Sequence, residues 1–97
     1  MNVLNLLQRK FQEALTGLVA DPAVYAAMLK PAQEARFGDY QANCAMPLKK
    51  VLGGDARQIA QTLVARLQLE DVLEPPAIAG PGFINLTLRT EWLAQQV

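Results

Sequence analysis

The run from Ala79 to Arg89, AGPGFINLTLR, constrains the fold of this chain more than any other stretch of it. A Gly-Pro-Gly turn leads directly into seven residues that alternate between two kinds of side chain. Successive side chains of a strand point to opposite faces of a sheet. One face would carry three aliphatic side chains, Ile84, Leu86 and Leu88. The other would carry a ring, an amide, a hydroxyl and a cation, from Phe83, Asn85, Thr87 and Arg89. The run predicts a strand over 83–89.

The N-terminal part of the chain has the apolar spacing of an amphipathic helix over residues 3–19. Asn2 is placed to cap its first turn, and Asp21-Pro22 ends it. Residues 24–30 predict a short strand or extended segment, which Pro31 stops. The apolar residues at helical spacing are Val3, Leu4, Leu7, Phe11, Leu15 and Leu18.

The middle of the chain predicts a second helix that runs from Tyr40 towards Leu52. Asp39 is in position to cap this helix, and Gly53-Gly54 ends it. Pro47 lies inside the segment and removes one backbone donor, so a kink or a break is expected near Ala45-Met46.

A third helix is expected after the glycine pair, with Asp55 as its cap and Gln58 completing a capping box. Ala77 to Ala79 predict a strand that the Gly-Pro-Gly turn joins to 83–89 as a hairpin. Thr90 can cap a last short helix that carries Trp92 and Leu93. With the 24–30 segment beside the hairpin, residues 1–97 form one α+β domain, a small antiparallel sheet with helices packed on one face.

Composition limits the functions that such a domain can have. Nine Lys and Arg residues balance nine Asp and Glu residues, which argues against a protein whose main task is to neutralise a long phosphate backbone. Contacts to RNA through a few local groups remain possible. Cys44 is the only cysteine, so neither a disulfide framework nor a metal site is expected. No apolar run approaches the roughly 18–20 residues of a membrane span and no secretory signal is recognisable, so a cytoplasmic protein without a membrane partner is expected.

The outer face of the predicted last strand suits an unstacked nucleobase. Phe83 offers a ring for stacking, Asn85 an amide for a base edge, and Arg89 a cation for phosphate. Alternatively, a terminal segment covers Phe83 and Asn85 satisfies a neighbouring backbone group. The Gly-Pro-Gly turn can also be read as an anion-binding loop, but it lacks the length and the lysine of a P-loop and a structural turn is the better interpretation.

Four blocks of sequence, in order, resemble the N-terminal additional domain of arginyl-tRNA synthetases: FGDYQAN (37–43), AMPL (45–48), RQIA (57–60) and AGPGFINL (79–86). The resemblance covers essentially the whole chain. It implies helices on a small antiparallel sheet, placed ahead of a class I catalytic domain. It also implies contact with the elbow of tRNA(Arg), where the domain reads the base at position 20 of the D-loop.

The resemblance further implies that Phe83 is the stacking or packing wall and Asn85 the hydrogen-bonding amide of that site. Gly80 stands where some members carry a polar residue, so it offers backbone contacts alone. The FGDYQAN block is interpreted as structural, although a direct tRNA role for Tyr40 or Gln41 is left open. Lys49 stands where alanine is frequent in the family, and its charge is best interpreted as part of a solvated helix face. Ala56 stands where proline is frequent.

The chain itself is expected to be non-catalytic. It contains no histidine, which excludes the HIGH signature of class I synthetases and the usual nucleophile–base pairs. No KMSKS-like run is present, and the carboxylates Glu70, Asp71 and Glu74 are interpreted as solvated charge. The resemblance implies that ATP and arginine bind an absent catalytic domain of the same polypeptide, with no cofactor in this chain. A stand-alone RNA-binding module and a protein-interaction domain are the alternatives.

Overall fold

The computed structural model describes residues 2–95 and contains one four-stranded antiparallel sheet. The strand order is β1-β2-β4-β3, so the two central strands are neighbours in space but far apart in sequence. The strands are β1 (Leu29–Pro31), β2 (Tyr40–Ala42), β3 (Ala77–Ala79) and β4 (Phe83–Leu86). The helices are α1 (Val3–Leu15), α2 (Pro22–Ala26), α3 (Ala45–Leu52), α4 (Ala56–Leu67) and α5 (Thr90–Gln95), with the 3-10 helix η1 at Ala35–Phe37.

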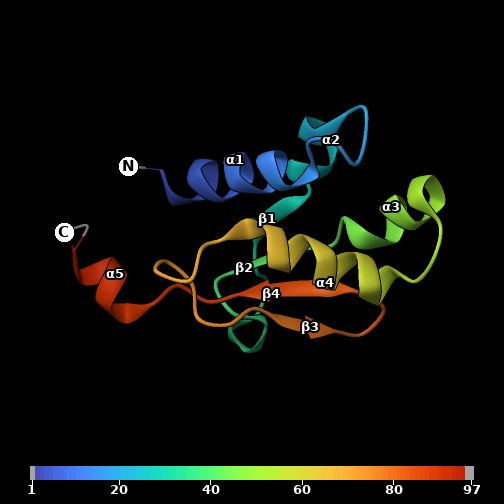
Figure 1. Ribbon diagram of the computed structural model, residues 1–97. Coiled ribbons are helices and arrows are strands. Elements are labelled where there is room, and N and C mark those ends of the chain that lie inside the picture. The colour runs from blue at the N-terminus through green and yellow to red at the C-terminus, as the bar shows by residue number, and fades with distance from the viewer. Residues whose placement is uncertain (1, 96–97) are drawn as a thin grey trace.

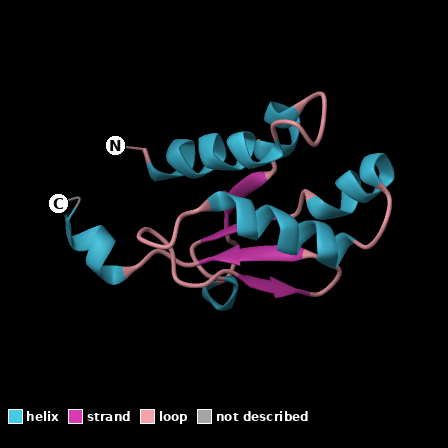
Figure 2. Ribbon diagram, in the orientation of Figure 1, coloured by secondary structure: helices cyan, strands magenta, loops and turns pink. Residues whose placement is uncertain are grey.

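Helices α1 and α4 form a layer over one side of the sheet, as Figure 1 shows, and Figure 2 distinguishes the two layers by colour. The predicted α+β, two-layer architecture is therefore confirmed. The core lies between the layers, and its aliphatic side chains each contribute roughly 1.5–3 kcal/mol by leaving water. The largest completely buried side chains include Leu7, Phe11, Leu15, Leu29, Leu48, Leu63, Ile84 and Leu86.

The helix predicted from Tyr40 to Leu52 is wrong in its first half, because residues 40–42 are the central strand β2. Asp39 does not cap a helix. Its backbone N–H donates to the carbonyl of Leu86 over 2.7 Å, and its carboxylate accepts from the N–H of Leu88 over 2.9 Å. Both bonds attach residue 39 to the last strand and its extension. Helix α3 begins at Ala45, so Pro47 lies in its first turn, where a missing N–H costs nothing and no kink is needed.

The N-terminal third also differs from expectation. Helix α1 ends at Leu15 rather than at residue 19, because Thr16 is already extended and Gly17 has φ +91°. Residues 22–26 form a short helix, and the strand that follows includes Pro31 instead of ending before it. Strand β1 is at the edge of the sheet, where a proline without an N–H is tolerated. It pairs with β2, so it does not lie beside the hairpin.

The local signals at helix ends are mostly confirmed. Asn2 accepts a hydrogen bond from the N–H of Asn5, and Asp55 accepts one from the N–H of Arg57. The second half of the capping box, a bond from Gln58 back to Asp55, is not among the hydrogen bonds of residues 2–95. The final helix is present, but Thr90 is its first residue rather than its cap.

Burial of Cys44 in the core has a measurable consequence for stability against pH. Desolvation raises the pKa of this thiol from 9.0 to about 11. Above pH 9 the unfolded chain releases this proton while the folded chain keeps it, so the free energy of unfolding falls as pH rises towards 11, by up to about 3 kcal/mol. Urea denaturation of the parent and of Cys44→Ala across this range should show a steeper decline for the parent. If the free energy of unfolding falls equally with pH in both proteins, the raised pKa of Cys44 is wrong.

Candidate nucleic-acid interface

Strand β4 shows the predicted alternation between apolar side chains on one face and Phe83 and Asn85 on the other. Ile84 and Leu86 are completely buried against the helices, while Phe83 and Asn85 are half-buried on the opposite side. Phe83 is therefore not sealed beneath the helices, and Asn85 is not turned into the core. The regular strand ends at Leu86, three residues earlier than predicted, and Leu88 forms only an isolated bridge to Leu73.

A row of side chains crosses the open side of the sheet at the level of Asn85. The register pairs Asn85 with Gln41 on β2, and Gln41 with Lys30 on β1. The Nε2 group of Gln41 donates a hydrogen bond to Oδ1 of Asn85 over 2.9 Å. We call Lys30, Gln41 and Asn85 the polar row. The sequence did not place Gln41 here, because residues 40–42 were expected to be helical.

The turn before β4 holds Phe83 from one side. Gly80 has φ +54°, and a Cβ atom at this position would lie 3.3 Å from Cδ2 of Phe83, so the backbone of the turn packs against the ring. The carbonyl of Gly80 accepts a hydrogen bond of 2.6 Å from Nη1 of Arg57, and the carbonyl of Ile78 accepts one of 3.3 Å from Nη2. Arg57, in the first turn of α4, therefore fixes the hairpin to the helical layer. The RQIA block carried this residue, but its function as an anchor was not predicted.

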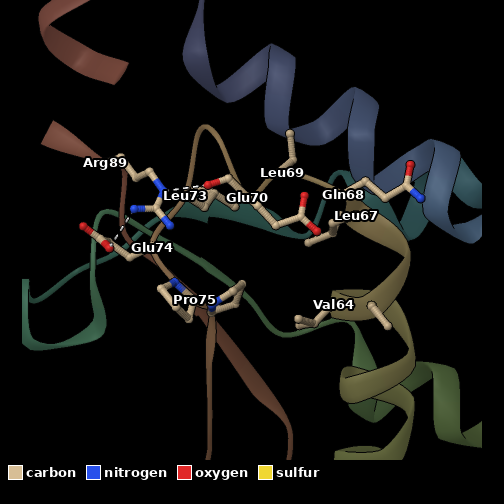
Figure 3. A pocket seen from close by; sticks show the side chains of 11 residues that line it. Val64, Leu67, Gln68, Leu69, Glu70, Leu73, Glu74, Pro75 and Arg89 are labelled. Carbon is tan, nitrogen blue, oxygen red and sulfur yellow. Dashed lines mark hydrogen bonds and ion pairs between the residues drawn. The ribbon is translucent and has the colours of Figure 1, made fainter. Parts of the chain in front are cut away.

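Arg89 does not stand free beside Asn85, contrary to expectation. Its Nε donates to the carbonyl of Glu70 over 2.6 Å, and its Nη1 lies 3.6 Å from the carboxylate of Glu74 (Figure 3). It lines a cavity of about 300 Å³ whose walls include Val64 and Pro75. Arg89 therefore belongs to the connection between α4 and β3. The view of Glu74 as purely solvated charge is corrected as well, since it is half-buried and paired.

Thr87 lies at the margin of the open face, next to the turn that contains Gly38. It is exposed, and a Cβ atom on Gly38 would come within 2.8 Å of its hydroxyl oxygen. Its backbone carbonyl accepts a hydrogen bond from the N–H of Glu74 over 2.8 Å. The five residues proposed from the sequence thus separate into a central pair, Phe83 and Asn85, two marginal positions, Gly80 and Thr87, and the displaced Arg89.

The polar row carries one positive charge, Lys30, which is exposed. Lys49 and Lys50 are exposed in the last turn of α3. Within residues 2–95 no ion pair engages any of these three. The same residues contain no group of three His, Cys, Asp or Glu side chains that could hold a metal ion. In that part of the chain, no helix combines the length and the apolar character that crossing a bilayer requires. The site offers stacking, hydrogen bonding and modest positive charge.

Residues 5–88 match the family model described as "Arginyl tRNA synthetase N terminal domain". Relatives named arginine–tRNA ligase include one from Rhodopirellula baltica, 45% identical over all 97 residues, and one from Synechococcus sp., 50% identical over 92 residues. These alignments cover 100% and 94% of this chain but only 14% and 16% of the relatives. The chain thus spans about a sixth of the length of the relatives that it matches.

A solved structure of arginyl-tRNA synthetase from Plasmodium falciparum has the same fold over 96% of this chain and 16% of its own, with a TM-score of 0.71. At 20% identity this similarity concerns the fold alone. The match to the family model covers far more than half of the chain, and all four sequence blocks lie within the matched residues. The chain therefore belongs to the family of arginyl-tRNA synthetase N-terminal domains.

Proposed function

We propose that this chain is the tRNA-recognition domain of an arginine–tRNA ligase and contacts the D-loop at the elbow of tRNA(Arg). In this proposal the base at position 20 leaves its own stack, lies against the ring of Phe83 and is read at its edge by the amide of Asn85. The observation that supports it most is the position of these two side chains, half-buried and adjacent on the side of the sheet away from α1 and α4.

The geometry of a strand allows Phe83 to stack on the base while Asn85 contacts its edge. Residues two apart on one face are separated by about 6.5–7 Å, so a base stacked on the Phe83 ring extends towards the Asn85 amide. Gly80 supports the ring through backbone packing and Thr87 borders the site. Arg89 takes no part in the proposed contact, because its guanidinium is already bound to Glu70 and Glu74.

The binding free energy that these two contacts can supply is too small to hold the tRNA, so the domain would add to an affinity that other domains provide. One stacked base and one base-edge contact contribute roughly 2–6 kcal/mol together. Micromolar binding requires about 8 kcal/mol. The same contacts become effective when other domains already hold the tRNA, because the additional contact is then intramolecular. Activation of arginine with ATP belongs, in this proposal, to a catalytic domain of the same polypeptide, since this chain has no histidine and no nucleophile–base pair.

Exchanging Asn85 for alanine in the full-length ligase should reduce discrimination between bases at position 20 by about tenfold, because a good base-edge contact is worth roughly 1–3 kcal/mol. The measurement is kcat/KM for arginylation of tRNA(Arg) and of its position-20 variants. Gln61→Ala is the matched control, since Gln61 is an exposed amide on α4, in the opposite layer. An unchanged ratio between tRNA variants in Asn85→Ala would refute the proposed function.

A further inference from the structure

The amide of Asn85 has two chemically opposite ends, and the polar row determines which of them is available. Its Oδ1 already accepts the hydrogen bond from Nε2 of Gln41 over 2.9 Å. Among residues 2–95 no hydrogen bond engages Nδ2 of Asn85, so the NH₂ end is the one left for a ligand. An amide that rotated by half a turn would bring two NH₂ groups together, and donors facing donors repel.

Lys30 gives the row a preferred direction. It faces Gln41 directly across the β1–β2 pair, and directly opposite Cβ atoms are about 4.5–5.5 Å apart. An ammonium beside Gln41 would attract its carbonyl oxygen and repel its NH₂ group. That interaction would favour the observed arrangement, in which the NH₂ group of Gln41 faces Asn85. Positive charge on the edge strand would thus favour the same orientation for the amides of Gln41 and Asn85.

We propose that Gln41 is a positioning residue, which holds the Asn85 amide so that its NH₂ group faces outwards and the site reads a hydrogen-bond acceptor on the base. This inference rests on the proposed function and adds to it both the polarity of the reading contact and the residue that sets it. A base presenting a ring nitrogen or a carbonyl oxygen towards Asn85 is accepted, and one presenting an amino group there is rejected.

Gln41→Glu provides the sharpest test, because a carboxylate accepts hydrogen bonds and cannot donate them. Nδ2 of Asn85 would then turn towards residue 41, leaving Oδ1 to face the base. The new negative charge weakens binding of every tRNA by a common factor, which cancels in ratios between tRNA variants. Relative kcat/KM for the four position-20 variants of tRNA(Arg), measured with the full-length ligase, should therefore change their order, and the base preferred by the parent should lose its first place.

Two further variants keep this inference testable if the charged one disturbs the sheet. Gln41→Met retains the length of the side chain but frees the Asn85 amide, and Gln41→Ala frees it by truncation. Both should reduce the ratio of kcat/KM between the best and the worst position-20 variant by about 2- to 10-fold, as expected for the loss of one orienting hydrogen bond. The order of the four variants should stay the same. In an Asn85→Ala background, none of the substitutions at residue 41 should change the ratios further.

The outcomes separate this inference from the function on which it rests. If Asn85→Ala narrows the spread but the three Gln41 variants keep the order and spread of the parent, the positioning role of Gln41 is wrong and the proposed function stands. If Asn85→Ala itself leaves all ratios unchanged, the proposed function fails first. A reordering by Gln41→Glu that persists without the Asn85 amide would also overturn the inference, because residue 41 would then contact the base itself.

Discussion

Exchanging Gly38 for alanine should lower the free energy of unfolding by about 3 kcal/mol or more, the largest effect on stability expected from any single methyl group here. Gly38 has φ +84° and ψ −156°, a backbone region that residues with a Cβ atom rarely enter, and the strain alone costs about 1–3 kcal/mol. The new Cβ atom would also lie 2.6 Å from the backbone carbonyl oxygen of Leu86. That oxygen belongs to β4 and cannot move without disturbing the sheet. Urea denaturation measures the loss.

Gly53 provides a matched control within the same chain. Its φ of +75° and ψ of −177° are close to those of Gly38, but a Cβ atom there would meet nothing within 4 Å. Gly53→Ala should therefore show the backbone strain without the steric overlap. Equal losses of stability in the two variants would contradict the close approach of the FGDYQAN turn to β4.

Exchanging Phe83 for alanine in the full-length ligase should lower kcat/KM for tRNA(Arg) by about 5- to 150-fold, because a stacked base is worth roughly 1–3 kcal/mol. Stacking tolerates every base, since each has a flat aromatic face. The decrease should thus be similar for all four position-20 variants. This distinguishes Phe83, which affects the absolute rate, from Asn85, which affects the ratio between bases.

Two substitutions at the same position separate stacking from support of the sheet. Phe83→Leu keeps most of the apolar volume beside Gly80 but has no ring, so it should be almost as impaired as alanine. Phe83→Trp keeps an aromatic surface and should retain most of the activity. Full activity of the leucine variant would show that residue 83 only fills space and would remove it from the proposed interface.

The parts of the fold that were predicted correctly depend on local chemistry. Three correct predictions rest on interactions between residues close in sequence. They are the alternation in β4, the caps at Asn2 and Asp55, and the glycine that ends α3. Periodicity and capping signals describe such short-range effects well. For the same reason the apolar face of β4 identified the side of the sheet that α1 and α4 cover.

The predictions that were wrong concern segments whose structure depends on residues far away in the sequence. Tyr40 to Ala42 form a strand because Asp39 bonds to Leu86 and Leu88, which lie 47 and 49 residues further along the chain. An aspartate before a helix-compatible segment looks the same in sequence whether it caps a helix or binds a distant strand. Because β2 was not predicted, the pairing of Gln41 with Asn85 was not predicted either.

Arg89 illustrates the same limit at the candidate site. Alternation placed it on the face of Asn85, but the strand ends at Leu86 and the chain then turns towards the connection after α4. The Glu70 carbonyl and the Glu74 carboxylate bind its guanidinium there. Phe83 and Asn85, which lie within the regular part of β4, occupy the positions that the sequence assigned to them.

A photo-crosslink from position 20 of the tRNA tests the central claim most directly. A tRNA(Arg) with 4-thiouridine at that position would be irradiated in complex with the full-length ligase, and the modified peptide would be identified by mass spectrometry. We expect adducts on Phe83 or Asn85 of β4, or on the adjacent Gln41 of β2. Adducts confined to the helical layer of α1 and α4, or to another domain of the ligase, would contradict the claim.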